Sequence, residues 1–203
     1  MNGQKYPVVL NGLTYGIVAL VLIGWFAVLL PQLTKPADVT LPATLPGYVA
    51  ADDAGRLADM EVTDQAGKTT TLTESLAASA QQQGTTADQM LQQIAATYRS
   101  QRSATDKALA DTYDEPAAQR SYVGSDQSVA TVTVARTDQA PLLTGGSGEQ
   151  LQQVDDATCL AGQSSSTCYR IAGDLLVQVQ AGAAPDDVAK LLDTFLPELT
   201  EQG

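Results

Sequence analysis

Hydrophobic positions are distributed very unevenly along this chain. Residues 6–34 are 29 consecutive uncharged residues, and 13–30 are almost wholly apolar. About 20 such residues cross the hydrocarbon core of a bilayer as a helix, whereas the apolar core of a signal peptide usually has about 7–15. The pattern therefore predicts a transmembrane anchor over residues 1–33, with a helix exit at Pro31.

A cleaved signal peptide is the alternative interpretation of this segment. It predicts small residues at a cleavage site just after the apolar run, but the residues there are Leu-Pro-Gln-Leu-Thr-Lys. No cysteine follows the run, so lipoprotein attachment is not expected either. We therefore expect a retained, single-pass anchor in the lipid bilayer.

Small residues recur along one face of the expected anchor. Gly12 and Gly16 are followed by Ala19 and Ala27. Such a face allows two helices to approach closely in lipid, where packing replaces the hydrophobic effect. Glycine and alanine are common in membrane helices in any case, which is the competing explanation. The face predicts packing against helices of other membrane-protein subunits.

Helical periodicity returns after a segment rich in proline. Residues 34–46 contain Pro36, Pro42 and Pro46, which predicts an extended tether before an outer domain over 47–203. Thr86 begins a capping box with Gln89, and a second helical stretch covers 103–113. The positions that recur at helical spacing after the box, and that we expect in the core, are Met90, Leu91, Ile94 and Tyr98.

The remaining pattern is that of strands, followed by one last helix. Residues 128–136 alternate and are β-branched, with 118–123 as partner and 175–180 as a third strand. A short strand pair is expected within 57–72, and the last helix should run from Pro185 to Pro197. Because short turns join consecutive strands, the expected fold class is α+β, an antiparallel sheet with helices packed on one face.

Two cysteines lie within the strand-rich part. The stretch 162–166 reads as a hairpin loop that brings Cys159 and Cys168 opposite each other. A disulfide there would close about ten residues and add roughly 2.5–3 kcal/mol of stability. A redox-active pair is the alternative. Disulfides persist in oxidising compartments, so we expect a cytoplasmic N-terminus and an extracytoplasmic domain at the cell membrane.

Composition excludes several classes of function. From residue 36 onward, 23 acidic residues face 9 Lys and Arg, a net charge of −14 that disfavours nucleic acid as a partner. Histidine is absent, so neither a Ser-His-Asp triad nor a His-ligated metal is possible. Two cysteines cannot hold a four-cysteine cluster, and no Ser-x-x-Lys occurs. We expect no enzyme and no cofactor.

Four acidic pairs are candidate ligands for calcium. A calcium loop places oxygen ligands at alternate positions around a central glycine and ends in glutamate, and none of the pairs has this form. Turns and a helix start explain them, so we assign no catalytic, metal-binding or cofactor-binding residue. The pairs are Asp52-Asp53, Asp114-Glu115, Asp155-Asp156 and Asp186-Asp187.

One stretch of the chain resembles a known class of protein. From Cys159 through Thr-Cys-Tyr-Arg-Ile-Ala-Gly-Asp-Leu-Leu-Val-Gln-Val-Gln, the sequence is similar to the ectodomains of small envelope proteins of actinobacteria. The resemblance covers about 118–196 and carries no catalytic motif. It implies a single-pass envelope protein. Some such proteins are accessory subunits of the cytochrome bc1–aa3 respiratory supercomplex of actinobacteria, and others are secreted proteins of unknown role.

These observations leave three functions to compare. The leading expectation is a non-catalytic accessory subunit of a larger membrane complex, which contacts other subunits through its anchor and its outer domain. The second is an envelope module that binds or senses a ligand. The third is a hydrolase that uses carboxylates, which would need a cleft with two converging acids.

Overall fold

The structure, a computed structural model, describes residues 39–63, 67–113, 116–137 and 150–200. The expected anchor over 1–33, with Gly12, Gly16, Ala19 and Ala27, lies outside these ranges. Over the described ranges, no helix is long and apolar enough to cross a membrane. The chain from Ala37 onward forms one compact unit.

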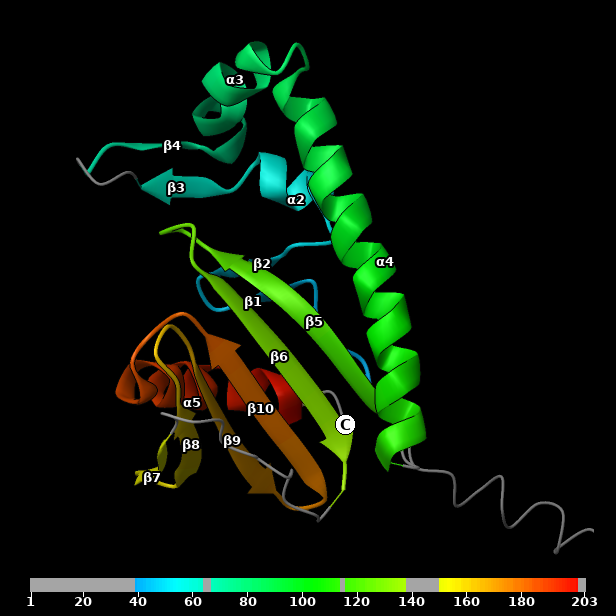
Figure 1. The fold of residues 1–203 in the computed structure, drawn as a ribbon, viewed down its shortest axis with the longest axis vertical. Helices are drawn as coiled ribbons and strands as arrows, with labels where there is room; N and C mark the ends of the chain where they lie inside the picture. Colours follow the sequence, from blue (N-terminus) through cyan, green and yellow to red (C-terminus); the bar gives the residue numbers. More distant parts are fainter. Residues whose placement is uncertain (1–38, 64–66, 114–115, 138–149, 201–203) are drawn as a thin grey trace, which may run out of the picture. The chain divides into compact units, whose positions relative to one another are not determined.

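Strands dominate this unit, and Figure 1 shows them as one broad antiparallel sheet. Within the described residues, eight strands pair in the order β1-β2-β5-β6-β10-β9-β8-β7. They are β1 (Thr44–Leu45), β2 (Tyr48–Ala50), β5 (Ala117–Gly124), β6 (Val129–Arg136), β7 (Gln150–Val154), β8 (Ala157–Ala161), β9 (Ser166–Ala172) and β10 (Leu175–Ala181). A separate hairpin joins β3 (Glu61–Thr63) to β4 (Thr69–Thr71), where the sequence predicts a strand pair. The predicted α+β class with an antiparallel sheet is confirmed.

The helices differ from the prediction in length and number. They are α2 (Ala54–Ala58), α3 (Leu72–Gln82), α4 (Ala87–Tyr113) and α5 (Pro185–Thr200). The predicted capping box is present, since the Thr86 hydroxyl accepts from the Gln89 backbone N–H over 3.2 Å. However, α4 is one helix of 27 residues rather than two, because neither glycine nor proline interrupts residues 87–113.

The principal core lies between α5 and one face of the sheet. Val132, Val177 and Val179 point to this face and are fully buried. Leu192 and Phe195 of α5 are equally buried in the same cluster, and Figure 1 shows α5 behind β10 and β9. Burial of each such side chain stabilises the fold by about 1.5–3 kcal/mol. This packing explains why α5 continues through Pro197, where the sequence predicts its end.

The start of the domain lies earlier than the sequence predicts. Leu41 and Leu45 belong to the expected tether, yet they are 5% and 4% exposed and pack in the principal core. The carbonyl oxygen of Pro42 accepts hydrogen bonds from Arg120 and from the hydroxyl of Tyr122. The predicted boundary at residue 47 therefore falls inside the packed unit.

Helix α4 runs beside the sheet instead of covering the α5 face. Its Asp106 accepts a hydrogen bond from the backbone N–H of Gln119 on β5, with 2.7 Å between Oδ1 and the nitrogen. Its N-terminal half joins a second, smaller core, in which Leu91 packs with Leu57 and Leu72. The prediction that helices pack on one face thus holds for α5 and not for α4. The short strand β2 pairs with only the last residues of β5, and α4 lies beside the remainder of β5.

Candidate functional site

The central part of the sheet face opposite α5 is polar. Strand side chains alternate between faces, so the valines that face α5 leave Thr131 and Thr133 of β6 on the other side. Gln178 and Gln180 of β10 lie on this same side, directly opposite those threonines. The opposite face is therefore lined by hydroxyl and amide groups in the centre of the sheet.

The strand register aligns these residues in two rows across six strands, from β5 to β7. We call these twelve positions the polar face. The first row is Gln119, Thr133, Gln178, Tyr169, Thr158 and Gln153. The second row is Ser121, Thr131, Gln180, Thr167, Leu160 and Leu151.

The polar face carries no formal charge at any of its positions. This is unexpected in a region of net charge −14, since a solvated sheet surface ordinarily includes lysine and glutamate. Neighbouring strands lie 4.7–4.9 Å apart, so six of them span about 24 Å. The result is an uncharged strip in which every side chain except those of Leu160 and Leu151 carries a hydrogen-bonding group.

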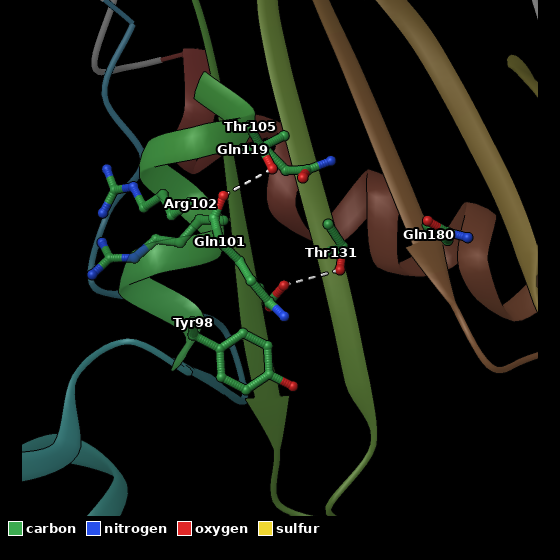
Figure 2. Close-up of a pocket in the computed structure, with 9 residues that line it drawn as sticks. Tyr98, Gln101, Arg102, Thr105, Gln119, Thr131 and Gln180 are labelled. Atoms are coloured by element: carbon green, nitrogen blue, oxygen red, sulfur yellow. Dashed lines mark hydrogen bonds between the residues drawn. The ribbon is translucent and has the colours of Figure 1, made fainter. Parts of the chain in front are cut away.

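Helix α4 borders one end of the polar face and forms a groove with it, which we call the α4 groove. Its volume is about 330 Å³, at the lower end of the size of ligand pockets. Figure 2 shows Tyr98 and Gln101 of α4 extending toward the strands that carry Thr131 and Gln180. The lining residues are Tyr98, Gln101, Arg102, Thr105, Gln119, Arg120, Ser121, Thr131 and Gln180.

Some polar groups of the groove are already paired within the protein. The hydroxyls of Ser121 and Thr131 lie 3.1 Å apart, and Gln119 donates from Nε2 to Thr133 over 3.0 Å. By contrast, the side chains of Tyr98, Gln101 and Gln180 make no hydrogen bond to any part of the chain that the structure describes. These three groups remain available to a ligand.

Behind the groove lies a buried ionic cluster centred on Asp52. Its side chain is only 6% exposed. Arg120 donates to Oδ1 over 2.6 Å, and Arg102 donates to Oδ2 over 3.0 Å. Arg99 adds a hydrogen bond from Nε to the Asp52 carbonyl oxygen, and Arg102 also lies 3.5 Å from Asp106. The guanidinium groups of Arg102 and Arg120, which line the groove, are therefore engaged by carboxylates.

The charge state of Asp52 follows from these contacts. Burial by itself raises the pKa of this carboxyl, but the hydrogen bonds from Arg120 and Arg102 outweigh it and hold the pKa below the ordinary 3.8. Asp52 is thus an anion at neutral pH. A general acid needs a pKa raised toward the working pH, so the environment of Asp52 does not suit that role.

The other acidic pairs lie where turns and helix starts explain them. Asp155 and Asp156 form the turn between β7 and β8, and Asp155 has a positive φ of 50°. Asp186 and Asp187 occupy the first turn of α5, as predicted. Asp114 and Glu115 lie outside the described residues. In the described ranges, no three His, Cys, Asp or Glu residues gather closely enough to hold a metal ion.

The predicted disulfide is present between Cys159 and Cys168. The two residues are directly opposite on β8 and β9, with 4.0 Å between their Cα atoms. Both side chains are fully buried on the α5 face, away from the polar face. This position identifies the bond as a staple of the core, and it is consistent with an oxidising compartment.

A second hollow, of about 490 Å³, lies at the β3–β4 hairpin. Its lining residues come from both sides in sequence of 64–66, which the structure does not describe, and none of them belongs to the polar face. Its lining residues are Val62, Lys68, Thr70, Glu74, Ser75 and Gln127. We therefore take the α4 groove and the polar face as the candidate site.

Comparison with known proteins identifies no relative of this chain. No family model, curated protein or solved structure matches the chain. Any assignment of function must therefore come from the groove, the polar face and their chemistry.

Sequence reasoning did not find this site. Tyr98 was expected in the core with Leu91, but Leu91 is 1% exposed whereas Tyr98 is half-buried and lines the groove. The local signal was present, since threonine alternates with valine in β6 and glutamine alternates with valine in β10. That alternation predicts strands with one polar face, but it does not reveal that the polar positions of six strands align.

Proposed function

We propose that this protein is a non-catalytic recognition protein of the cell envelope, and that its outer domain binds through the polar face. The observation that carries the proposal is the absence of charge from two rows of side chains that cross six strands. The free-energy cost of removing a group from water is smaller for uncharged hydroxyls and amides than for carboxylates and ammonium groups. Such a face is suited to being covered by a partner.

The state of the acidic residues favours recognition over hydrolysis. Hydrolysis by carboxylates needs one raised pKa and two acids that converge on a cleft. Asp52 and Asp106 are the carboxylates beside the α4 groove, and both are paired with Arg102. The pKa of Asp52 is lowered by Arg120 and Arg102. No Asp or Glu lines the groove itself. Binding is the chemistry that these groups support.

Site-specific photocrosslinking in the native cell tests the proposal. A photoreactive amino acid replaces Gln180, which is exposed on the polar face, and in a matched strain it replaces Gln81, which is exposed on α3. We expect adducts from position 180 and none from position 81. Equal labelling from both positions, or labelling from position 81 alone, would contradict the proposal.

A second candidate function is that of an accessory subunit of a larger membrane complex, such as the actinobacterial respiratory supercomplex that the resemblance implies. It is favoured by the small-residue spacing of Gly12, Gly16, Ala19 and Ala27 in the expected anchor. Its test is retention in the complex after extraction in mild detergent. Gly16→Ile should release the protein from its partners, whereas Leu22→Ile should not, because lipid is indifferent to one apolar side chain over another.

A further inference from the structure

We infer that the ligand of the polar face is a neutral glycan chain, and that the α4 groove is the subsite that holds one of its sugar units. This inference deepens the proposed recognition function and rests on it. It follows from three properties of the site: its hydrogen-bonding groups, its aromatic rings and its charge.

Hydrogen-bonding groups of both kinds surround the groove. A sugar hydroxyl both donates and accepts, and a glutamine amide offers two donors and one acceptor carbonyl. The free amides of Gln101 and Gln180 stand on opposite walls, one on α4 and one on β10 (Figure 2). A sugar ring that carries several hydroxyls can therefore form hydrogen bonds to both walls. It would replace the water that otherwise solvates these amides.

Aromatic rings supply the apolar part of sugar recognition. One face of a pyranose ring presents C–H groups, which pack against the face of an aromatic side chain. Tyr98 lines the groove, and Tyr169 lies in the first row of the polar face, on β9. Both side chains are half-buried, so each ring is held by its neighbours and still has accessible surface.

Charge argues against an anionic ligand. Arg102 and Arg120 are the only cationic residues that line the groove, and both are paired with Asp52. The chain beyond residue 36 carries a net charge of −14, which repels phosphates and carboxylates. A neutral ligand avoids this repulsion.

The dimensions favour a chain over a single sugar. The groove lies at one end of a strip that spans about 24 Å from β5 to β7. The strip repeats the same kinds of group, since Gln178, Tyr169, Thr158 and Gln153 follow one another in register. A polymer of similar units matches such a surface better than one small molecule does.

Equilibrium binding by the full-length protein in a mild detergent tests the inference. The probes are the tetramers of β-linked glucose and of β-linked N-acetylglucosamine, with oligogalacturonate as the anionic counterpart. We expect at least one neutral tetramer to bind and oligogalacturonate not to bind. Tyr98→Ala should weaken the neutral interaction about tenfold, which is the factor that corresponds to one aromatic contact.

Two further variants keep the test decisive. Gln180→Glu places a charge on the polar face without removing packing, and it should also weaken binding. Gln92→Ala changes an exposed residue of α4 outside the groove lining and should leave affinity unchanged. Urea midpoints equal to that of the parent protein would establish that the variants are folded.

The possible failures are distinguishable. If neither neutral tetramer binds, or if oligogalacturonate is preferred, the glycan inference is wrong. Unchanged affinity in both Tyr98→Ala and Gln180→Glu would show that the α4 groove is not the subsite. In that case, photocrosslinks from position 180 to a protein would support the proposed recognition function and would show that its ligand is a protein and not a glycan.

Discussion

Arg120 donates two hydrogen bonds to a single carboxylate oxygen of Asp52, over 2.6 Å from Nη2 and 2.9 Å from Nε, although 68 positions separate the two residues. The same guanidinium donates from Nη1 to the carbonyl oxygens of Leu41 and Pro42. One side chain of β5 thus connects the start of the domain, the loop before α2 and, through Asp52, helix α4. The cluster positions the helix that forms one wall of the groove.

Removal of the Asp52 carboxylate should destabilise the fold strongly. In Asp52→Ala, Arg120 is left with only 12% of its side chain exposed and with no anion beside it. Breaking such a buried pair costs about 3–5 kcal/mol. The exposed residue Asp59 serves as control, and Asp59→Ala should change stability by less than about 0.5 kcal/mol. Urea unfolding of the two variants measures the difference, and similar losses of stability would contradict a structural role for the Asp52 cluster.

Low pH should abolish the stabilisation of the fold by the Asp52 carboxylate. Because the folded-state pKa of Asp52 lies below its ordinary 3.8, its stabilising effect is complete above that value and is lost as pH falls through the folded pKa. The stability difference between the parent protein and Asp52→Asn should therefore shrink as pH is lowered from about 6 to about 2. Unfolding midpoints at several pH values measure it. A difference that is constant with pH would exclude this role for the carboxylate.

The sequence predicted the parts of the fold that depend on local pattern. The alternation in 128–136 and 175–180 predicts strands, and β6 and β10 lie there. Edge strand β7 was missed, because Gln-Leu-Gln-Gln-Val has little apolar alternation and its residues are mostly exposed. Strands β1 and β2 were missed because proline dominates the segment before them.

The candidate site was beyond sequence reasoning for a different reason. Its first row begins at Gln119 and ends at Gln153, and the alignment depends on five separate strand pairings. A shift of one residue in any pairing would move side chains to the other face. The turn at Asp52 likewise gives no local sign of its arginine partners, which follow 50 and 68 positions later.

The disulfide should resist reduction in the folded protein. Cys159 and Cys168 are fully buried under α5, so a reductant reaches the bond only when the sheet opens. Native protein treated with dithiothreitol should show almost no alkylation at these residues, whereas protein in urea should be alkylated fully. Cys159→Ala combined with Cys168→Ala should lose roughly 2.5–3 kcal/mol of stability by the loop-entropy estimate. Rapid alkylation of the native protein would indicate an exposed, redox-active pair.

A glycine at the end of β5 gives a prediction about packing near the sheet edge. A Cβ atom at Gly124 would lie 2.9 Å from Cε1 of Tyr48, 2.8 Å from Oδ1 of Asp126 and 3.0 Å from Oγ of Ser128. The Tyr48 ring cannot retreat easily, since it packs edge-on against Phe195 with 5.3 Å between ring centroids. Gly124→Ala should therefore destabilise the domain by about 1–3 kcal/mol through overpacking.

The matched control is Gly55→Ala in helix α2, which should have the opposite sign. A Cβ at Gly55 meets only Oδ1 of Asp53 at 3.7 Å, an ordinary contact. Glycine in a helix is less favourable than alanine because it loses more backbone freedom on folding, so the substitution should stabilise by about 0.5 kcal/mol. Urea unfolding of the two variants compares the same chemical change at two positions. If Gly124→Ala is as stable as the parent protein, the Tyr48 ring can move away from the added methyl group. Packing against Phe195 then does not fix the position of the ring.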